Sequence, residues 1–318
     1  METRTFGKLG PVSALTLGGG GTGGVWGATT REEAVETVLA AVEGGITFLD
    51  VAPGYGNGEA ERVVGEAFGG RLPDGVRIST KHHLGNVPAG EVAGTLRQAL
   101  AASLDRLRLE RVDLFFLHGM VVPDGFEGRG TPRSLFVEAA RPAFEAMVAD
   151  GTIGAWGVSG VGVPSALLET LAEDPAPAAI QCVANLLDSP GGMRAYEEDP
   201  RPRELIAAAN ARGVGVMGIR AVQAGALTDA IDRDLPDDHP EVVDFERAAP
   251  FRALAAEVGE SPASLAHRYT LSMEGIATVI LGVKNRAELT ECLEAEAKGP
   301  LDAELMARID AAVAERQG

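Results

Sequence analysis

Short apolar runs alternate along the chain with longer stretches of helical periodicity. Each run has the length of a buried strand and is followed by a helical segment, which favours βα units with parallel strands. Eight runs predict a closed (β/α)8 TIM barrel, the α/β fold in which eight strands form the wall. The runs cover residues 14–18, 46–51, 77–80, 114–118, 154–159, 180–185, 215–219 and 278–283.

Capping and turn residues mark the ends of several elements. Thr30 and Glu33 have the spacing of a capping box, ahead of a helix that ends near Gly44. Ser261 and the proline after it begin another helix. Near the amino terminus, residues 8–10 separate two short extended pieces, which predicts an N-terminal β-hairpin on the barrel floor.

Three long segments rich in glycine, proline and acidic residues interrupt the pattern: 119–132, 188–202 and 229–240. They follow the fourth, sixth and seventh predicted strands. In a barrel, such loops lie on the catalytic face and set substrate specificity.

Composition narrows the class of protein. With 318 residues, 45% of them hydrophobic, we expect residues 1–318 to form a single barrel domain. The formal net charge of -18 disfavours nucleic acids and anionic membranes as partners. The sequence contains no signal-peptide or membrane-spanning run, so we expect a cytoplasmic location. The sequence does not predict the oligomeric state. Cys182 and Cys292 lack metal-site spacing, and only one of the five histidines clearly ends a strand, which disfavours a metal-dependent hydrolase.

Ionisable residues end three consecutive predicted strands. Asp50, Lys81 and His118 occupy these ends, and Tyr55 lies on the loop after Asp50. Each residue alone is readily explained as part of a structural ion pair or hydrogen bond. Because the carboxyl ends of barrel strands meet at one mouth, the four together indicate an active site.

These residues lie in motifs that resemble the catalytic tetrad of the aldo-keto reductase family. The motifs are DVAPGYG, STK and LFFLH, and GAWGVS, IQCVANLLD and LGVKNRAELTEC follow in the family's order. The resemblance covers nearly the whole chain. It implies an NAD(P)-dependent oxidoreductase that acts on carbonyl or alcohol groups.

The resemblance also implies a role for each residue. Tyr55 would give a proton to the developing alkoxide, the ammonium of Lys81 would stabilise the phenolate, and Asp50 would hold Lys81. His118 would orient and polarise the carbonyl, and Trp26 would line the substrate pocket beside Tyr55 and His118. An alternative is a nicotinamide-binding regulatory barrel that resembles potassium-channel β subunits, but the complete tetrad favours an enzyme.

The expected cofactor residues follow from the same matching. Ser159 and Gln181 would bind the nicotinamide carboxamide, although Gly160 replaces the family's usual asparagine. Ile219 stands in place of a stacking aromatic residue, and Arg220 would reach the pyrophosphate. Gly19 and Gly20 would allow close approach of the cofactor or substrate.

After the eighth strand, Gly282, Lys284 and Asn285 lead into a helix whose amides can hold a phosphate. Lys284 and Arg286 favour NADP through its 2′-phosphate, and NAD is the other possibility. Against NADP, Glu288 stands where family members often carry Arg or Gln, and its carboxylate would repel a phosphate. Cys292 stands where many members have Asn at the adenine.

Overall fold

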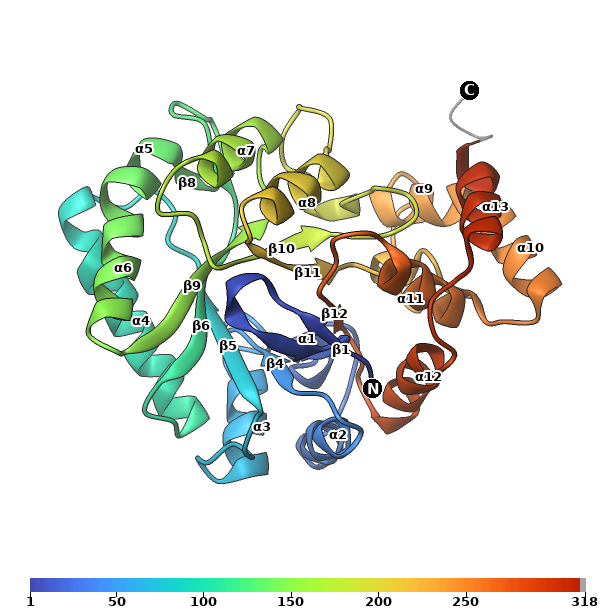
Figure 1. The fold of residues 1–318 in the computed structure, drawn as a ribbon, viewed down its shortest axis with the longest axis horizontal. Coiled ribbons are helices and arrows are strands. Elements are labelled where there is room, and N and C mark those ends of the chain that lie inside the picture. Colours follow the sequence, from blue (N-terminus) through green and yellow to red (C-terminus); the bar gives the residue numbers. More distant parts are fainter. Residues whose placement is uncertain (315–318) are drawn as a thin grey trace.

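Eight parallel strands form a closed barrel in the computed structural model, which describes residues 1–314 (Figure 1). All eight predicted strands are confirmed, and no strand end is shifted by more than two residues. Neighbours pair in the order β3-β4-β5-β6-β9-β10-β11-β12, and β12 returns to β3 through pairs such as Ile280 with Thr16. The strands are β3 (Leu15–Gly18), β4 (Phe48–Asp50), β5 (Arg77–His82), β6 (Val112–Leu117), β9 (Ile153–Gly160), β10 (Ala179–Val183), β11 (Gly215–Ile219) and β12 (Thr278–Leu281).

Helices surround the barrel, as Figure 1 shows. The longer ones are α2 (Arg31–Glu43), α3 (Glu59–Phe68), α4 (Val92–Leu107), α6 (Arg141–Ala149), α7 (Pro164–Ala172), α8 (Pro202–Ala211), α9 (Pro240–Arg247), α10 (Ala249–Val258), α11 (Pro262–Ser272), α12 (Arg286–Ala297) and α13 (Ala303–Ala314). The short ones are α1 (Gly19–Thr22), α5 (Arg133–Leu135), η1 (Gly7–Leu9), η2 (Ala89–Glu91), η3 (Phe136–Ala140), η4 (Gly191–Met193) and η5 (Gln223–Gly225).

The amino-terminal hairpin is confirmed. Strands β1 (Thr3–Thr5) and β2 (Pro11–Ser13) pair antiparallel, and the dark blue hairpin crosses the centre of the barrel in Figure 1. Phe6 is fully buried and packs edge-on to Phe48, with ring centroids 6.0 Å apart. A Cβ on Gly215, the first residue of β11, would lie 2.3 Å from the Phe6 ring. Phe6 therefore closes the barrel at the amino ends of its strands, and Gly215 makes room for it.

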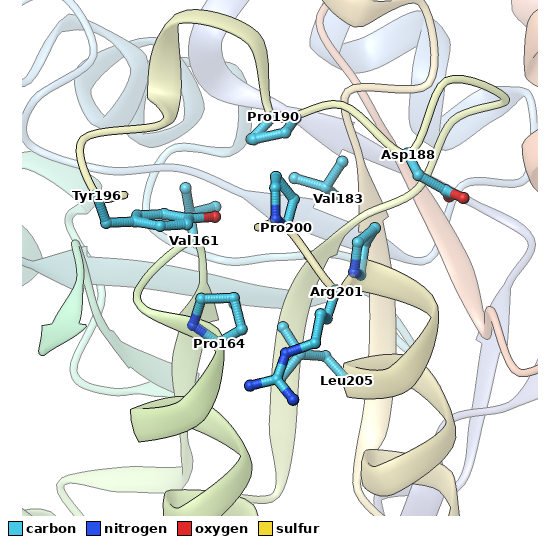
Figure 2. Close-up of a pocket in the computed structure, with 11 residues that line it drawn as sticks. Val161, Pro164, Val183, Asp188, Pro190, Tyr196, Pro200, Arg201 and Leu205 are labelled. Carbon is cyan, nitrogen blue, oxygen red and sulfur yellow. The ribbon is translucent and has the colours of Figure 1, made fainter. Parts of the chain in front are cut away.

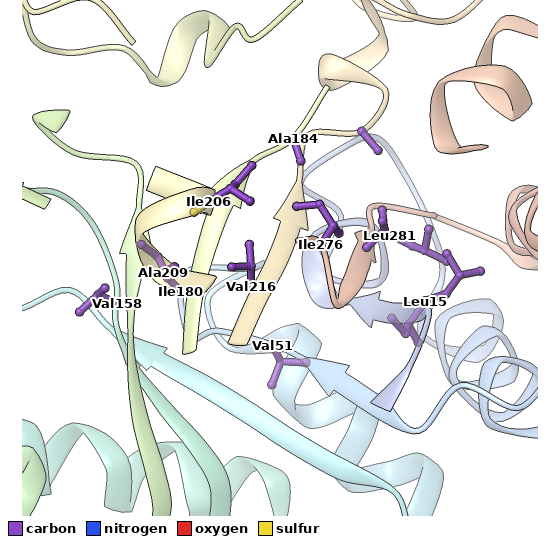
Figure 3. Packing of buried hydrophobic residues seen from close by; sticks show 14 of the residues in the cluster. Leu15, Val51, Val158, Ile180, Ala184, Ile206, Ala209, Val216, Ile276 and Leu281 are labelled. Carbon is purple, nitrogen blue, oxygen red and sulfur yellow. The ribbon is translucent and has the colours of Figure 1, made fainter. Parts of the chain in front are cut away.

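Apolar side chains on the outer side of the barrel pack under the helices. Ile180 and Val216 from the strands lie near Ile206 and Ala209 of α8 in Figure 3, and all four are buried. The helices therefore hold the strands in a fixed register, and the strand ends are a rigid base for side chains at the rim.

Helix capping follows the sequence in part. Thr30 accepts a hydrogen bond from the Glu33 backbone N–H at 3.1 Å, and Ser261 caps α11 in the same way. Only this half of the predicted capping box is present in the structure. The Glu33 carboxylate instead accepts from the backbone N–H of Arg286 at 3.2 Å, a contact between α2 and α12.

The three predicted loops are partly ordered. Segment 119–132 contains the short parallel strands β7 (Val121–Val122) and β8 (Thr131–Pro132), and segment 188–202 contains η4. Segment 229–240 has no helix or strand before Pro240, the first residue of α9. All three follow the carboxyl ends of barrel strands.

Candidate active site

A buried ion pair joins two neighbouring strands at the carboxyl-end rim. Lys81 Nζ lies 2.6 Å from Asp50 Oδ2, and the two side chains are 0% and 2% exposed. The other oxygen of Asp50 accepts hydrogen bonds from Ser79 at 2.6 Å and from Gln181 Nε2 at 2.7 Å. Three polar side chains therefore compensate the buried carboxylate, which fixes its position.

Tyr55 reaches this pair from the turn before α3. Its hydroxyl lies 3.5 Å from Lys81 Nζ, which also donates to the Val51 carbonyl at 3.0 Å. Burial alone would lower the pKa of Lys81, but the charge of Asp50 and the contact with Tyr55 outweigh it and raise the pKa above its ordinary value of 10.5. The ammonium next to the phenol is therefore charged at neutral pH.

Glycines allow the tyrosine to approach so closely. A Cβ on Gly19 would lie 3.3 Å from the Tyr55 ring and 2.9 Å from the Ala60 side chain, and one on Gly23 would lie 2.9 Å from the Tyr55 carbonyl. Gly19 thus has a packing role beneath the tyrosine.

His118 completes the group of four. It follows β6, and its ring meets that of Tyr55 edge to face, with centroids 5.9 Å apart. Its backbone N–H donates to the His82 carbonyl at 2.7 Å, and its own carbonyl lies 2.9 Å from His83 Nδ1. Burial and then the nearby charge of Lys81 lower the pKa of His118 to about 3. A neutral imidazole therefore faces the site at pH 7 and can donate a hydrogen bond without a charge.

The residues expected at the nicotinamide end lie on the next strands around the barrel. Ser159, the residue before the end of β9, is buried and donates to the Leu117 carbonyl at 3.1 Å. Ile219 ends β11 and is half-buried. The amide nitrogen of Gln181 donates its hydrogen bond to Asp50. A Cβ at Gly160 would lie only 2.8 Å from the Gln181 carbonyl, so this backbone has no room for the family's asparagine.

Trp26 packs onto two of the predicted cofactor glycines. A Cβ on Gly20 would lie 2.6 Å from Trp26 Nε1, and one on Gly282 would lie 3.0 Å from the same nitrogen. The indole is half-buried in this position. The indole therefore packs directly on the backbone of Gly20 and Gly282, between the ends of β3 and β12.

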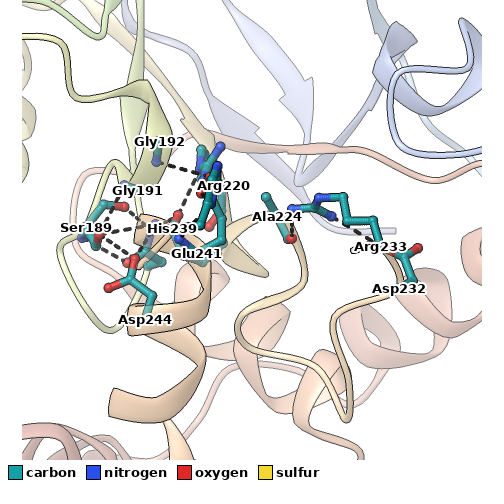
Figure 4. A network of polar contacts seen from close by, with 12 residues as sticks. Ser189, Gly191, Gly192, Arg220, Ala224, Asp232, Arg233, His239, Glu241 and Asp244 are labelled. Atoms are coloured by element: carbon teal, nitrogen blue, oxygen red, sulfur yellow. Dashed lines mark hydrogen bonds and ion pairs between the residues drawn. The ribbon is translucent and has the colours of Figure 1, made fainter. Parts of the chain in front are cut away.

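Arg220 is held in a buried network on the loops after β10 and β11 (Figure 4). Its guanidinium lies 2.5 Å from Glu241 Oε1 and 2.9 Å from the side-chain oxygen of Gln223. His239 Nδ1 lies 2.7 Å from the other oxygen of Glu241. The backbone at Arg220 has a φ of 63°, a left-handed conformation that such a network can maintain. The charge of Arg220 is thus already compensated within the protein.

The residues expected at the adenosine end gather at the start of α12. Asn285 caps the helix by accepting from the Glu288 backbone N–H at 3.0 Å. Lys284 forms ion pairs with Asp232 at 2.8 Å and with Glu288 at 3.3 Å. Cys292 is buried between α12 and α11, with its sulfur 3.8 Å from His267 Nε2, and burial raises its pKa to about 12.

A pocket lies beside the rim between the ends of β9 and β10 and the 188–202 loop (Figure 2). Pro190, Tyr196 and Pro200 of that loop close it on one side, and Val161 and Pro164 lie on the other. The tetrad residues do not line this pocket. The loop predicted to set specificity therefore packs against the barrel next to the site.

Sequence reasoning did not identify every residue that contacts the predicted site residues. Ser79 belongs to the quoted STK motif, and its place two residues before Lys81 is a sequence signal for a side chain on the same face. Asp232 and Glu241 lie in acidic, irregular segments and gave no comparable signal. Within residues 1–314, no helix is both long and apolar enough to span a bilayer, and no cluster of three potential metal ligands is found.

Comparison with known proteins agrees with this geometry. The model of the Aldo/keto reductase family matches residues 14–314, so the chain belongs to this family. Nicotinamide-dependent oxidoreduction is the chemistry of its members.

Two curated relatives and one solved structure match this chain over most of its length. The chain is 23% identical to an L-galactose dehydrogenase of Arabidopsis thaliana, over 98% of this chain and 94% of the relative. It is 25% identical to a D-threo-aldose 1-dehydrogenase of a Pseudomonas species, over 89% of each chain. Its fold matches the structure of a glycerol dehydrogenase from Gluconobacter oxydans with a TM-score of 0.75 at 23% identity, covering 98% of this chain and 95% of the other.

Proposed function

We propose that the protein transfers hydride between a nicotinamide cofactor and a carbonyl or hydroxyl group of a small, uncharged substrate, acting on CH–OH groups in the oxidative direction. The observation that carries the proposal is the buried Asp50–Lys81 pair with the Tyr55 hydroxyl 3.5 Å from the ammonium. The dehydrogenases of sugars and polyols among the relatives support a polyhydroxylated or carbonyl substrate for this chain too.

In the direction of reduction, a reduced nicotinamide, when bound, would provide the hydride equivalent. Tyr55 gives its hydroxyl proton to the carbonyl oxygen as negative charge develops there. The ammonium of Lys81 stabilises the phenolate that remains, and Asp50 keeps Lys81 charged and in place. His118, neutral at pH 7, holds the carbonyl oxygen by a hydrogen bond from its ring.

The side chains at the rim fit a nicotinamide. Ser159 near the end of β9 and Gln181 in the middle of β10 are both buried. The amide nitrogen of Gln181 binds Asp50, so Gln181 would use its oxygen to accept from the carboxamide. Ile219 would give the ring an aliphatic surface. The NADP preference expected from Lys284 and Arg286 is supported less well, because both side chains pair with carboxylates.

The function is tested by following nicotinamide absorbance with a panel of aldehydes, ketones, aldoses and polyols. Tyr55→Phe keeps the ring but removes the proton, and we expect it to lower kcat by at least about a hundredfold while the Kd of the cofactor stays within about twofold. Turnover equal to that of the unmodified protein would remove Tyr55 from its role. Cofactor binding without turnover of any substrate would instead favour the regulatory barrel.

A further inference from the structure

The start of α12 is already filled by carboxylates of the protein itself. Glu288 Oε2 accepts from the Lys284 backbone N–H at 2.8 Å, and its other oxygen lies 3.3 Å from the Lys284 ammonium. Glu33 accepts from the Arg286 backbone N–H at 3.2 Å. Backbone N–H groups and an adjacent ammonium are the donors that a phosphate requires at a helix amino terminus. Here they bind carboxylates of α12 and α2.

The two basic side chains at the start of α12 are also paired with carboxylates. Lys284 lies 2.8 Å from Asp232, and Arg286 lies 2.8 Å from Glu36. The hydrogen bond to Asp232 is the largest cause that raises the pKa of Lys284 above 10.5. A third cation, Arg233, lies 3.3 Å from Asp232. Three cations therefore face the four carboxylates of Asp232, Glu288, Glu33 and Glu36, and the region has a formal charge of minus one.

The negative charge of this region affects the binding of NADP(H) and NAD(H) differently. A 2′-phosphate carries nearly two negative charges at neutral pH, and it would have to displace carboxylates that stay within a few ångströms. A ribose hydroxyl carries no charge and can donate a hydrogen bond to a carboxylate. A surface hollow lined by Glu33, Asn285, Arg286, Ala287 and Thr290 adjoins this region, so one of the carboxylates forms part of its wall.

The net charge of the whole protein also disfavours the binding of a 2′-phosphate. The formal net charge of -18 raises the cost of bringing any additional anionic group to the surface, although salt screens this contribution. The local carboxylates and the overall charge therefore both favour the less charged dinucleotide.

We infer that this barrel selects NAD(H) over NADP(H), with Glu288 as the specificity-determining residue and Glu33 and Asp232 as its neighbours in the same role. The inference rests on the proposed function, since it concerns the adenosine end of the same cofactor. It reverses the preference expected from the basic side chains in the sequence.

The test measures equilibrium binding of NADH and NADPH by calorimetry at low ionic strength, with no substrate present. The unmodified protein should bind NADH at least about tenfold more tightly, the size expected for two charges repelled by one carboxylate at about 6 Å in a water-like dielectric. Glu288→Gln keeps the shape of the side chain but removes its charge. It should lower the ratio of the NADPH Kd to the NADH Kd by about tenfold, mainly through tighter NADPH binding.

Glu294→Gln is the matched control, because it removes the same charge from an exposed position on α12 and should leave the ratio within twofold. Circular dichroism establishes that each variant is folded. The unmodified protein provides a second comparison that needs no variant: 5′-AMP should bind more tightly than 2′,5′-ADP, which adds only the 2′-phosphate.

Equal or tighter binding of NADPH by the unmodified protein would overturn the inference, and so would a binding ratio that Glu288→Gln does not change. Failure of both dinucleotides to bind would contradict the proposed function itself, so the two failures are distinguishable.

Discussion

Replacing Asp50 by Asn tests the contact on which the site depends. The carboxylate now accepts from the Lys81 ammonium on one oxygen and from Ser79 and Gln181 on the other. An amide in the same place turns its NH2 group either toward the ammonium or toward the other two donors. In both orientations, a donor faces a donor in a site that is 2% exposed or less.

The magnitude follows from burial. Breaking a buried ion pair by removing one charge costs about 3–5 kcal/mol, because the remaining charge has lost its partner. With about 2.1 cal/mol/K of unfolding entropy per residue over 318 residues, this loss lowers the thermal midpoint by about 4–7 °C. The pKa of Lys81 should also fall, since burial then acts without the opposing charge.

Asp150→Asn provides the matched control. Asp150 pairs with Arg97 at the same 2.6 Å, but its side chain is 41% exposed, so the ion pair is screened by solvent and should contribute little. Calorimetry of both variants at pH 7 gives the two midpoints, and kcat is measured alongside. A midpoint for Asp50→Asn no lower than that for Asp150→Asn would refute the argument that burial determines the contribution of this pair.

Two further predictions concern pH and packing. The pKa of His118, about 3 in the folded protein against 6.5 for the free group, means that the unfolded chain binds the proton first. This contribution to stability is present above about pH 6.5 and is lost as the pH falls toward 3, so urea unfolding should show a loss of about 2 kcal/mol between pH 7 and pH 5 that His118→Gln reduces. An equal loss in that variant would assign the acid sensitivity to other groups. Gly215→Ala places a methyl group 2.3 Å from the Phe6 ring and should destabilise the protein by about 1–3 kcal/mol, whereas Gly94→Ala in α4 meets no atom within 4 Å and should stabilise it slightly. Equal midpoints for these two alanine variants would argue against tight packing at the barrel floor.

The sequence predicted the frame of the molecule well because the relevant signals are local. The eight strands appear as short apolar runs, and the hairpin follows from its turn residues. Asp50, Lys81 and His118 come together because each lies within one residue of the end of its own strand. Their proximity is thus a consequence of the barrel topology, which the number and spacing of the runs already indicate.

Other contacts at the site were not predictable in this way. Glu33 has the spacing of a capping residue for its own helix, yet its carboxylate binds the backbone of Arg286, which lies 253 positions away. Gln181 was expected at the nicotinamide carboxamide, and the structure shows its amide nitrogen donating to Asp50 across the barrel. Arg220 and Lys284 were expected to bind phosphates, and the structure pairs them with Glu241 and Asp232.

The sequence by itself thus determined the fold class, the family and the four residues at the rim, since periodicity and motif order are properties of neighbouring positions. Only the tertiary structure decided which charges compensate one another around that rim. The partners lie on loops without periodicity, far apart along the chain, and their distances depend on how those loops pack against the finished barrel.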